Sequence, residues 1–184
     1  FLTFVFQTVF VVALIAMSFQ LYFSPGHWAF ISGVNLIFHE AGHVIFSLFG
    51  QFMYVLGGTI GELLIPTVVA GHFFLKRQLF SLGFALWWLS TALLNVGIYA
   101  ADAKERALPL ITGDESTHDW MYLLLETNLI RYDNIIGGIF ITASVFVFLG
   151  ALMVFSNAFG TIIIYGNRQA PRILRDPAYS TDRT

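Results

Sequence analysis

Three ionisable side chains, His39, Glu40 and His43, lie inside the apolar stretch NLIFHEAGHVIF at residues 35–46. On a helix, residues four apart project from one face about a turn apart, so both imidazoles can reach one cation. Glu40 points about 100° from His39 and about 60° from His43, so its carboxylate can reach a water on that cation without being a ligand. The H-E-x-x-H spacing therefore predicts two zinc ligands and a general base.

The same residues have a second interpretation that needs no metal. His39, Glu40 and His43 could form hydrogen bonds between helices, because polar groups inside a membrane bundle must find partners. Asn35 falls on the same helical face and extends the polar stripe. Glu62, in a later apolar run, could make a hydrogen bond across the bundle or act near the metal. The complete motif favours zinc for the first three residues, and both interpretations stay open for Glu62.

A catalytic zinc site usually has three protein ligands and one open position, so a third ligand must come from elsewhere in the chain. The candidates are Asp102, His118 and Asp119, at the two ends of a polar segment over residues 101–119. One of them could instead orient a ligand imidazole. For Asp119 the simpler alternative is that it caps the helix that follows, a role for which His118 is not needed.

The elements that position these residues are predicted to be membrane-spanning helices. The chain of 184 residues is 57% hydrophobic and 11% charged, and its mean hydropathy is +0.75. A water-soluble domain has about 25% charged residues, and an apolar run of about 20 residues is long enough to cross a bilayer as a helix. Several such runs occur without alternating polarity, which predicts an all-α, polytopic transmembrane bundle rather than a barrel.

About five spans are expected, with a polar loop over 101–119 and a short interfacial helix at about 119–130, capped by Thr117 or Asp119. A glycine-bearing stretch, GQFMYVLGG, should connect the second and third spans. Residues 1–165 should form one transmembrane domain and residues 166–184 a polar tail. The predicted spans are 1–23, 29–49, 59–75, 78–100 and a last one within 134–165.

Composition also excludes some classes of function. The chain has no cysteine, which rules out disulfides and thiolate metal sites. Its formal net charge is −2, and it has no basic cluster of the kind that binds nucleic acid. The expected surroundings of this chain are therefore the lipid bilayer and membrane-embedded partners.

The motif and its context resemble the site-2 protease family of intramembrane zinc metalloproteases and its less characterised bacterial relatives. The resemblance covers roughly residues 29 to 102: FHEAGHVIF in an early span, a glycine-bearing turn, a third span, and Asn95 and Asp102 around the end of the fourth. It implies that His39, His43 and Asp102 bind zinc, that Glu40 activates water and that Asn95 assists the transition state.

The family's Asn-Pro…Asp-Gly pattern is not present in this chain. No proline lies between Asn95 and Asp102, and an alanine follows Asp102. His118 therefore stays beside Asp102 as a preferred candidate for the third ligand, and Asp119 is the further alternative.

Together these features predict an intramembrane zinc metalloprotease with one zinc ion. A zinc-bound water would attack a peptide bond in or near the membrane, and Glu40 would accept its proton. The substrate would be a membrane protein or peptide, and the resemblance places the chain in a bacterial inner membrane. Two other functions stay open: a metal-binding membrane protein without proteolysis, and a transport or lipid-processing protein that uses the same polar cavity.

Overall fold

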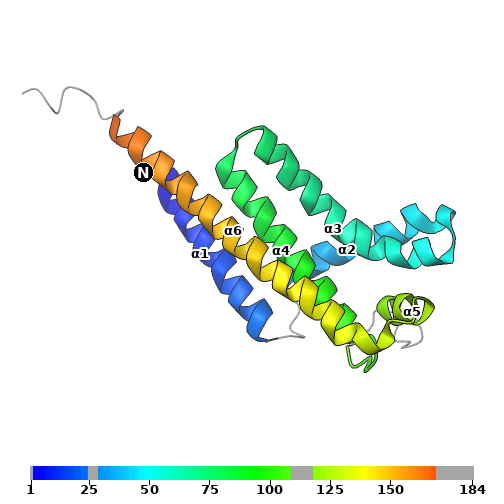
Figure 1. Ribbon diagram of the computed structural model, residues 1–184. Helices are drawn as coiled ribbons and strands as arrows, with labels where there is room; N and C mark the ends of the chain where they lie inside the picture. Colours follow the sequence, from blue (N-terminus) through cyan, green and yellow to red (C-terminus); the bar gives the residue numbers. More distant parts are fainter. Residues whose placement is uncertain (1, 25–28, 109–117, 169–184) are drawn as a thin grey trace, which may run out of the picture.

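The computed structural model describes residues 2–24, 29–108 and 118–168, and these residues are helical with no strand (Figure 1). The predicted all-α fold class is therefore confirmed for the described part of the chain. Short 3-10 turns, η1 and η3, precede the third and the last α-helix. In chain order the elements are α1 (Leu2–Phe23), α2 (Phe30–Phe46), η1 (Ser47–Phe49), α3 (Gln51–Leu75), α4 (Leu79–Ala101), α5 (Asp119–Glu126), η3 (Ile130–Tyr132) and α6 (Asp133–Arg168).

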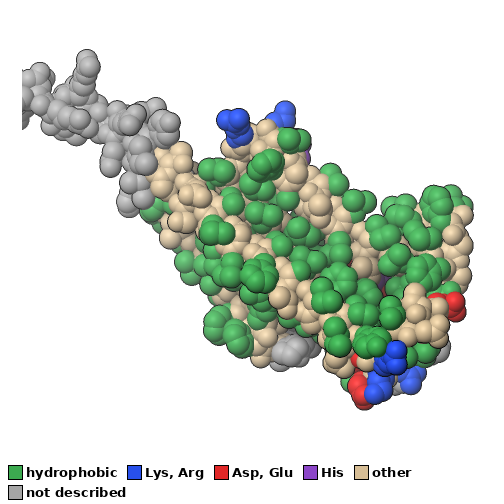
Figure 2. Space-filling model, viewed as in Figure 1, with side chains coloured by type: hydrophobic (Ala, Val, Ile, Leu, Met, Phe, Trp, Pro, Cys, Tyr) green, Lys and Arg blue, Asp and Glu red, His purple; other side chains and the backbone are tan. Residues whose placement is uncertain are grey.

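Four helical segments are long and apolar enough to cross a membrane: α1, α3, α4 and Ile130–Thr161, which contains η3 and most of α6. The helix predicted as the second span is present as α2, but its 17 residues are fewer than the roughly 20 that a span needs. Figure 2 shows hydrophobic side chains over most of one face, with Lys and Arg side chains at its opposite ends. This distribution is typical of a membrane protein.

The helix after the motif begins earlier than predicted. The stretch GQFMYVLGG was expected to connect two spans, whereas α3 already begins at Gln51. Gly50, with a φ of +88°, makes the turn, and this backbone conformation favours glycine. Gly57 is helical and serves close packing, since a Cβ there would lie 2.6 Å from the carbonyl oxygen of Gly42. The helices α2 and α3 therefore form a tight hairpin.

Polar side chains hold α2 on α4. The indole Nε1–H of Trp88 donates to Asn35 Oδ1 at 2.8 Å, and Asn35 Nδ2 donates to Thr91 Oγ1 at 3.4 Å. Asn35, which the sequence placed on the face of the metal motif, thus has a structural role. These contacts fix the start of α2, and with it the direction in which its later turns project.

The helix α5 begins as predicted at Asp119, but its cap is a different residue. The N-cap is His118, whose Nδ1 accepts a hydrogen bond from the N–H of Met121 at 3.3 Å. The predicted capping by Asp119 is wrong because this residue is already helical, which leaves its carboxylate free for other contacts. The alternative cap, Thr117, lies outside the described residues.

The end of α5 also differs from the prediction, since the helix stops at Glu126 rather than at about 130. Asn128 has a φ of +58°, and the N–H of Leu129 donates to the carbonyl of Leu124 at 2.8 Å. This is the Schellman arrangement, in which a left-handed residue such as Asn ends a helix.

The last helix, α6, begins at Asp133 and runs to Arg168. It therefore extends three residues into the segment 166–184 that was predicted to be a polar tail. The rest of that segment lies outside the described residues.

The helix α4 lies in the middle of the bundle and carries much of the core. It packs closely on α6, because a Cβ on Gly97 would lie 2.9 Å from the carbonyl oxygen of Gly137. A separate apolar cluster joins the start of α3 and the end of α4 to α5, and so places α5 beside the hairpin (Figure 1). Its buried members are Val55, Val96, Ala100, Ala103, Trp120, Leu123 and Leu124.

Candidate metal centre

The two histidines of the motif lie on the buried face of α2, in its last turns. Their side chains are nearly covered, with exposed fractions of 7% for His39 and 8% for His43. The ring centroids are 4.8 Å apart and the ring planes are close to perpendicular. The predicted pairing of the two imidazoles on one face of a helix is therefore confirmed.

The first residue of α5 brings a carboxylate to both imidazoles. Asp119 Oδ2 lies 2.8 Å from His39 Nε2 and 3.2 Å from His43 Nε2. Ligand atoms about 2.0–2.1 Å from a tetrahedral ion lie roughly 3.3 Å from one another. The two distances from the Asp119 oxygen are of this order, and all three ligand atoms lie within 4.8 Å of one another. His39, His43 and Asp119 therefore form a cluster that could hold one metal ion.

The other nitrogen of each ring is held by an acceptor outside the cluster. His39 Nδ1–H donates to Glu62 Oε2 at 3.3 Å, and His43 Nδ1–H donates to the carbonyl oxygen of Tyr54 at 2.8 Å. Such contacts fix the ring orientation of metal-binding histidines and favour the tautomer whose Nε2 can bind a metal. The two Nε2 atoms converge on one carboxylate oxygen. Such an arrangement is held either by hydrogens on Nε2, as in the 2.8 Å hydrogen bond between His39 and Asp119, or by one bound cation.

A glycine of α3 leaves room beside the converging atoms. A Cβ on Gly58 would lie 2.6 Å from His39 Nε2 and 2.7 Å from His43 Nε2, closer than such contacts allow. Any side chain at this position would press on the nitrogens that could bind a metal. The hairpin of α2 and α3 therefore supplies the two histidines, the acceptors of their Nδ1–H groups and the space beside their Nε2 atoms.

Electrostatics keeps the Asp119 carboxylate ionised. Burial alone would raise the pKa of Asp119, but the hydrogen bonds from His39 and His43 outweigh this effect, so the pKa lies below its usual range. Burial lowers the pKa of His118, which favours its neutral form. An ionised carboxylate is the form of aspartate that binds a cation.

Glu40 and Asn95, the two expected catalytic residues, lie outside this cluster. Glu40 follows His39 on α2 and its side chain is exposed, while Asn95 is half-buried on α4. Among the described contacts neither side chain makes a hydrogen bond or an ion pair with the three clustered residues.

Asp102 and His118, the two third-ligand candidates preferred from the sequence, are not brought into the cluster. The Asp102 carboxylate accepts the backbone N–H groups of Ala107 at 2.9 Å and Leu108 at 3.0 Å. His118 uses Nδ1 to cap α5, and its Nε2 lies 3.6 Å from Asp102 Oδ2. The position next to His118, which the sequence left open as an alternative, is the one that reaches the histidines.

Sequence reasoning did not identify two further residues around the cluster, Tyr54 and Tyr99. The hydrogen bond across the bundle that was one interpretation of Glu62 is present, and its partner is His39. Tyr54 contributes only a backbone oxygen, which no side-chain pattern reveals. Tyr99 accepts the N–H of Asp119 at 3.1 Å through its hydroxyl. Its position on α4, two residues before the polar segment, was the only feature of the sequence that could have indicated this role.

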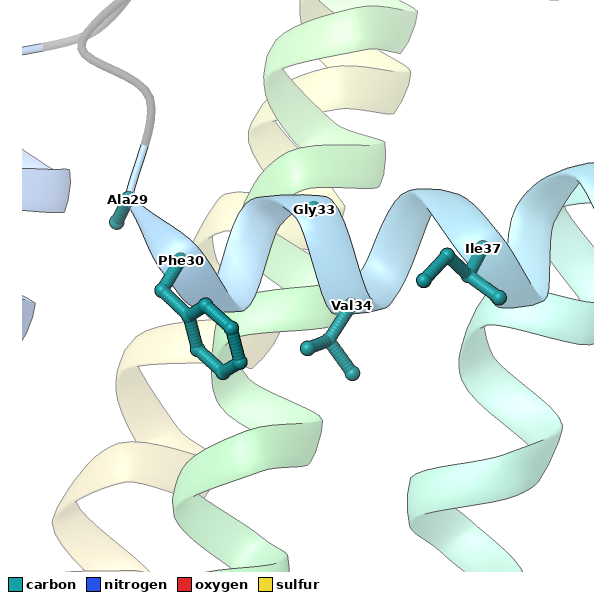
Figure 3. A pocket seen from close by; sticks show the side chains of 5 residues that line it. All are labelled: Ala29, Phe30, Gly33, Val34 and Ile37. Carbon is teal, nitrogen blue, oxygen red and sulfur yellow. The ribbon is translucent and has the colours of Figure 1, made fainter.

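An apolar hollow lies along the first turns of α2 (Figure 3). It ends at Ile37, three residues before Glu40, and both side chains are exposed. The residues that line it are Ala29, Phe30, Gly33, Val34 and Ile37.

The comparisons with known proteins add no family to this description. No protein-family model, curated protein or solved structure matches the chain.

Proposed function

We propose that the chain is a membrane metalloprotein in which His39, His43 and Asp119 bind one zinc ion and which hydrolyses a peptide bond. The observation that supports this proposal most strongly is the convergence of two Nε2 atoms and one carboxylate oxygen, with both Nδ1 atoms held by acceptors behind them.

Zinc fits the donor set better than Mg²⁺ or Ca²⁺ does. Two imidazole nitrogens and one carboxylate oxygen resemble the ligand sets of catalytic zinc sites, which keep one coordination position open. Mg²⁺ and Ca²⁺ prefer sites made of oxygen ligands. With three protein ligands, a water or substrate oxygen would take the remaining position.

The residues around the site then have distinct roles. A bound metal would polarise a carbonyl group and make water more acidic. Glu40, adjacent to a ligand and exposed, would accept a proton as the general base. Asn95 would hydrogen bond to the reacting group, as the resemblance to the site-2 proteases implies. Glu62 would keep His39 oriented toward the ion.

The surroundings of Glu40 support an apolar class of substrate. The exposed side of α2 is apolar before this residue, where the hollow ends at Ile37, and apolar after it, where Val44 is 73% exposed. A membrane-embedded or juxtamembrane segment of another protein matches such a surface. The resemblance also supports a bacterial inner membrane as the location.

The peptidase proposal is tested by replacing Glu40 with glutamine. Glu40→Gln should retain zinc at the wild-type stoichiometry and lower the rate of cleavage by about 10²–10⁴-fold, because only the proton acceptor is lost. The measurement combines zinc analysis of the purified protein with quantitative labelling of new peptide N-termini in membranes of cells that express each form.

Glu126→Gln is the matched control, since it makes the same change on an exposed carboxylate at the end of α5. It should leave both readouts unchanged. Equal cleavage by wild type and Glu40→Gln would contradict the mechanism. Bound zinc with no cleavage product in the wild type would instead favour a metal-binding membrane protein without peptidase activity.

A further inference from the structure

The junction between α4 and α5 decides where the proposed third ligand lies. Asp119 is the first residue of α5, a helix of only eight residues. A helix this short has little stability of its own. The position of its carboxylate therefore depends on the groups that hold the first turn of α5.

Two side chains hold that turn by accepting its free N–H groups. Tyr99 Oη accepts the N–H of Asp119 at 3.1 Å, and His118 Nδ1 accepts the N–H of Met121 at 3.3 Å. The rings of Tyr99 and His118 also lie against each other, with centroids 4.2 Å apart. The first N–H groups of a helix have no partner within the helix, so these contacts fix both the start and the direction of α5.

The Asp102 carboxylate faces Nε2 of His118. Because Nδ1 of His118 accepts a hydrogen bond, the ring hydrogen is on Nε2, which lies 3.6 Å from Asp102 Oδ2. The His118 side chain has an exposed fraction of 0%, and among the described residues its Nε2 has no hydrogen-bond partner. A buried polar atom without a partner is costly, so the facing carboxylate stabilises this orientation of the ring. Asp102 is itself fixed by the N–H groups of Ala107 and Leu108.

We propose that Asp102 and His118 are positioning residues that present Asp119 to the metal, and are not ligands themselves. Asp102 orients the His118 ring, His118 caps α5, and the capped helix directs Asp119 Oδ2 between the two imidazoles. In this arrangement His118 has no bare nitrogen to offer a metal, because one nitrogen accepts a hydrogen bond and the other carries the ring hydrogen. This inference rests on the proposed metal centre.

The test compares two substitutions of His118 in the detergent-solubilised full chain, titrated with Zn²⁺ against a competing chelator. His118→Ala removes the cap and should weaken zinc binding by about 10–100-fold, as is usual when a group that orients a metal ligand is lost. His118→Asn should recover most of that affinity, since asparagine is a good N-cap but replaces the imidazole. With Co²⁺ in place of zinc, both variants should keep the wild-type absorption bands, because the ligand set is unchanged.

The role of Asp102 is tested by a double-mutant cycle. Asp102→Ala should weaken zinc binding in the wild type and have little further effect in His118→Ala, because the two residues act through one contact. Ser144→Ala is the structural control: it removes a partly buried hydrogen bond with Tyr22 between α1 and α6, away from α5. It should leave the zinc affinity unchanged even if it lowers thermal stability.

Equal loss of zinc in His118→Ala and His118→Asn, with altered Co²⁺ bands, would overturn the inference and make His118 a ligand. Wild-type affinity in His118→Ala, or fully additive effects of the two alanine substitutions, would also overturn it. If His118→Ala fails to fold, His118→Asn alone decides, since retained affinity supports positioning and lost zinc contradicts it. Absence of zinc binding in the wild type would instead overturn the metal centre itself, and the inference with it.

Discussion

The imidazole of His39 is held from two sides, by Glu62 at Nδ1 and by Asp119 at Nε2. Glu62 is buried, with an exposed fraction of 6%, and a buried carboxylate needs a partner that offsets the cost of leaving water. The hydrogen on Nδ1 is that partner, and its position there leaves Nε2 free to bind a metal. At the scale of single residues, Glu62 therefore sets the orientation and tautomer of a proposed ligand.

This role predicts different outcomes for two substitutions of Glu62. Glu62→Gln keeps an oxygen that accepts from His39 Nδ1 and should lower zinc affinity only slightly. Glu62→Leu removes the acceptor at similar volume and should lower zinc affinity by about 10–100-fold. A zinc titration in competition with a chelator measures both, and a Glu62→Leu protein with wild-type affinity would show that Glu62 serves only packing.

At the scale of elements, the close crossing of α2 and α3 places the two histidines against Gly58 of α3, which has no side chain. Gly58 faces both Nε2 atoms. The carbonyl oxygen of Tyr54, one turn earlier on α3, accepts a hydrogen bond from His43 Nδ1–H. The first turns of α3 are therefore part of the proposed centre, and a connecting turn in this place could not provide the same contacts.

A methyl group at Gly58 should therefore damage the centre directly. Gly58→Ala places a Cβ about where a metal would approach, and overpacking of this kind costs roughly 1–3 kcal/mol, so zinc binding should be lost or greatly weakened. Gly71→Ala is the matched control on the same helix, because a Cβ there meets nothing within 4 Å. Zinc titration of both variants measures the effect, and equal affinities would contradict the proposed position of the ion.

The same elements show what local patterns can and cannot predict. The pairing of His39 with His43 follows from helical periodicity alone, and the sequence predicted it. The third ligand depends on how α5 packs beside the hairpin, a long-range arrangement that no local pattern encodes. The resemblance favoured Asp102, and the possible capping role of Asp119 favoured His118 over it, but Asp119 is the residue that reaches the histidines. Gly57 was taken for a connection because glycine weakens helices, whereas here it permits two helices to touch.

At the scale of the whole molecule, a small polar centre is built into a bundle that is otherwise apolar. Four helical segments have the length and composition of membrane spans, and ionisable groups among such segments are costly and usually functional. His39, His43, Glu62 and Asp119 are gathered in one place, and each has at least one partner within 3.3 Å. A single bound cation would offset the charge of the two carboxylates more completely than hydrogen bonds alone.

The zinc content of the purified full chain is the most direct measurement of this centre. The wild type should hold one zinc ion per chain after gel filtration in detergent, and both His43→Ala and Asp119→Ala should hold none, because each removes one of three ligands. Gly71→Ala, purified in parallel, should hold the wild-type amount. A wild-type chain without metal, or an Asp119→Ala chain that keeps one zinc ion, would contradict a centre formed by His39, His43 and Asp119.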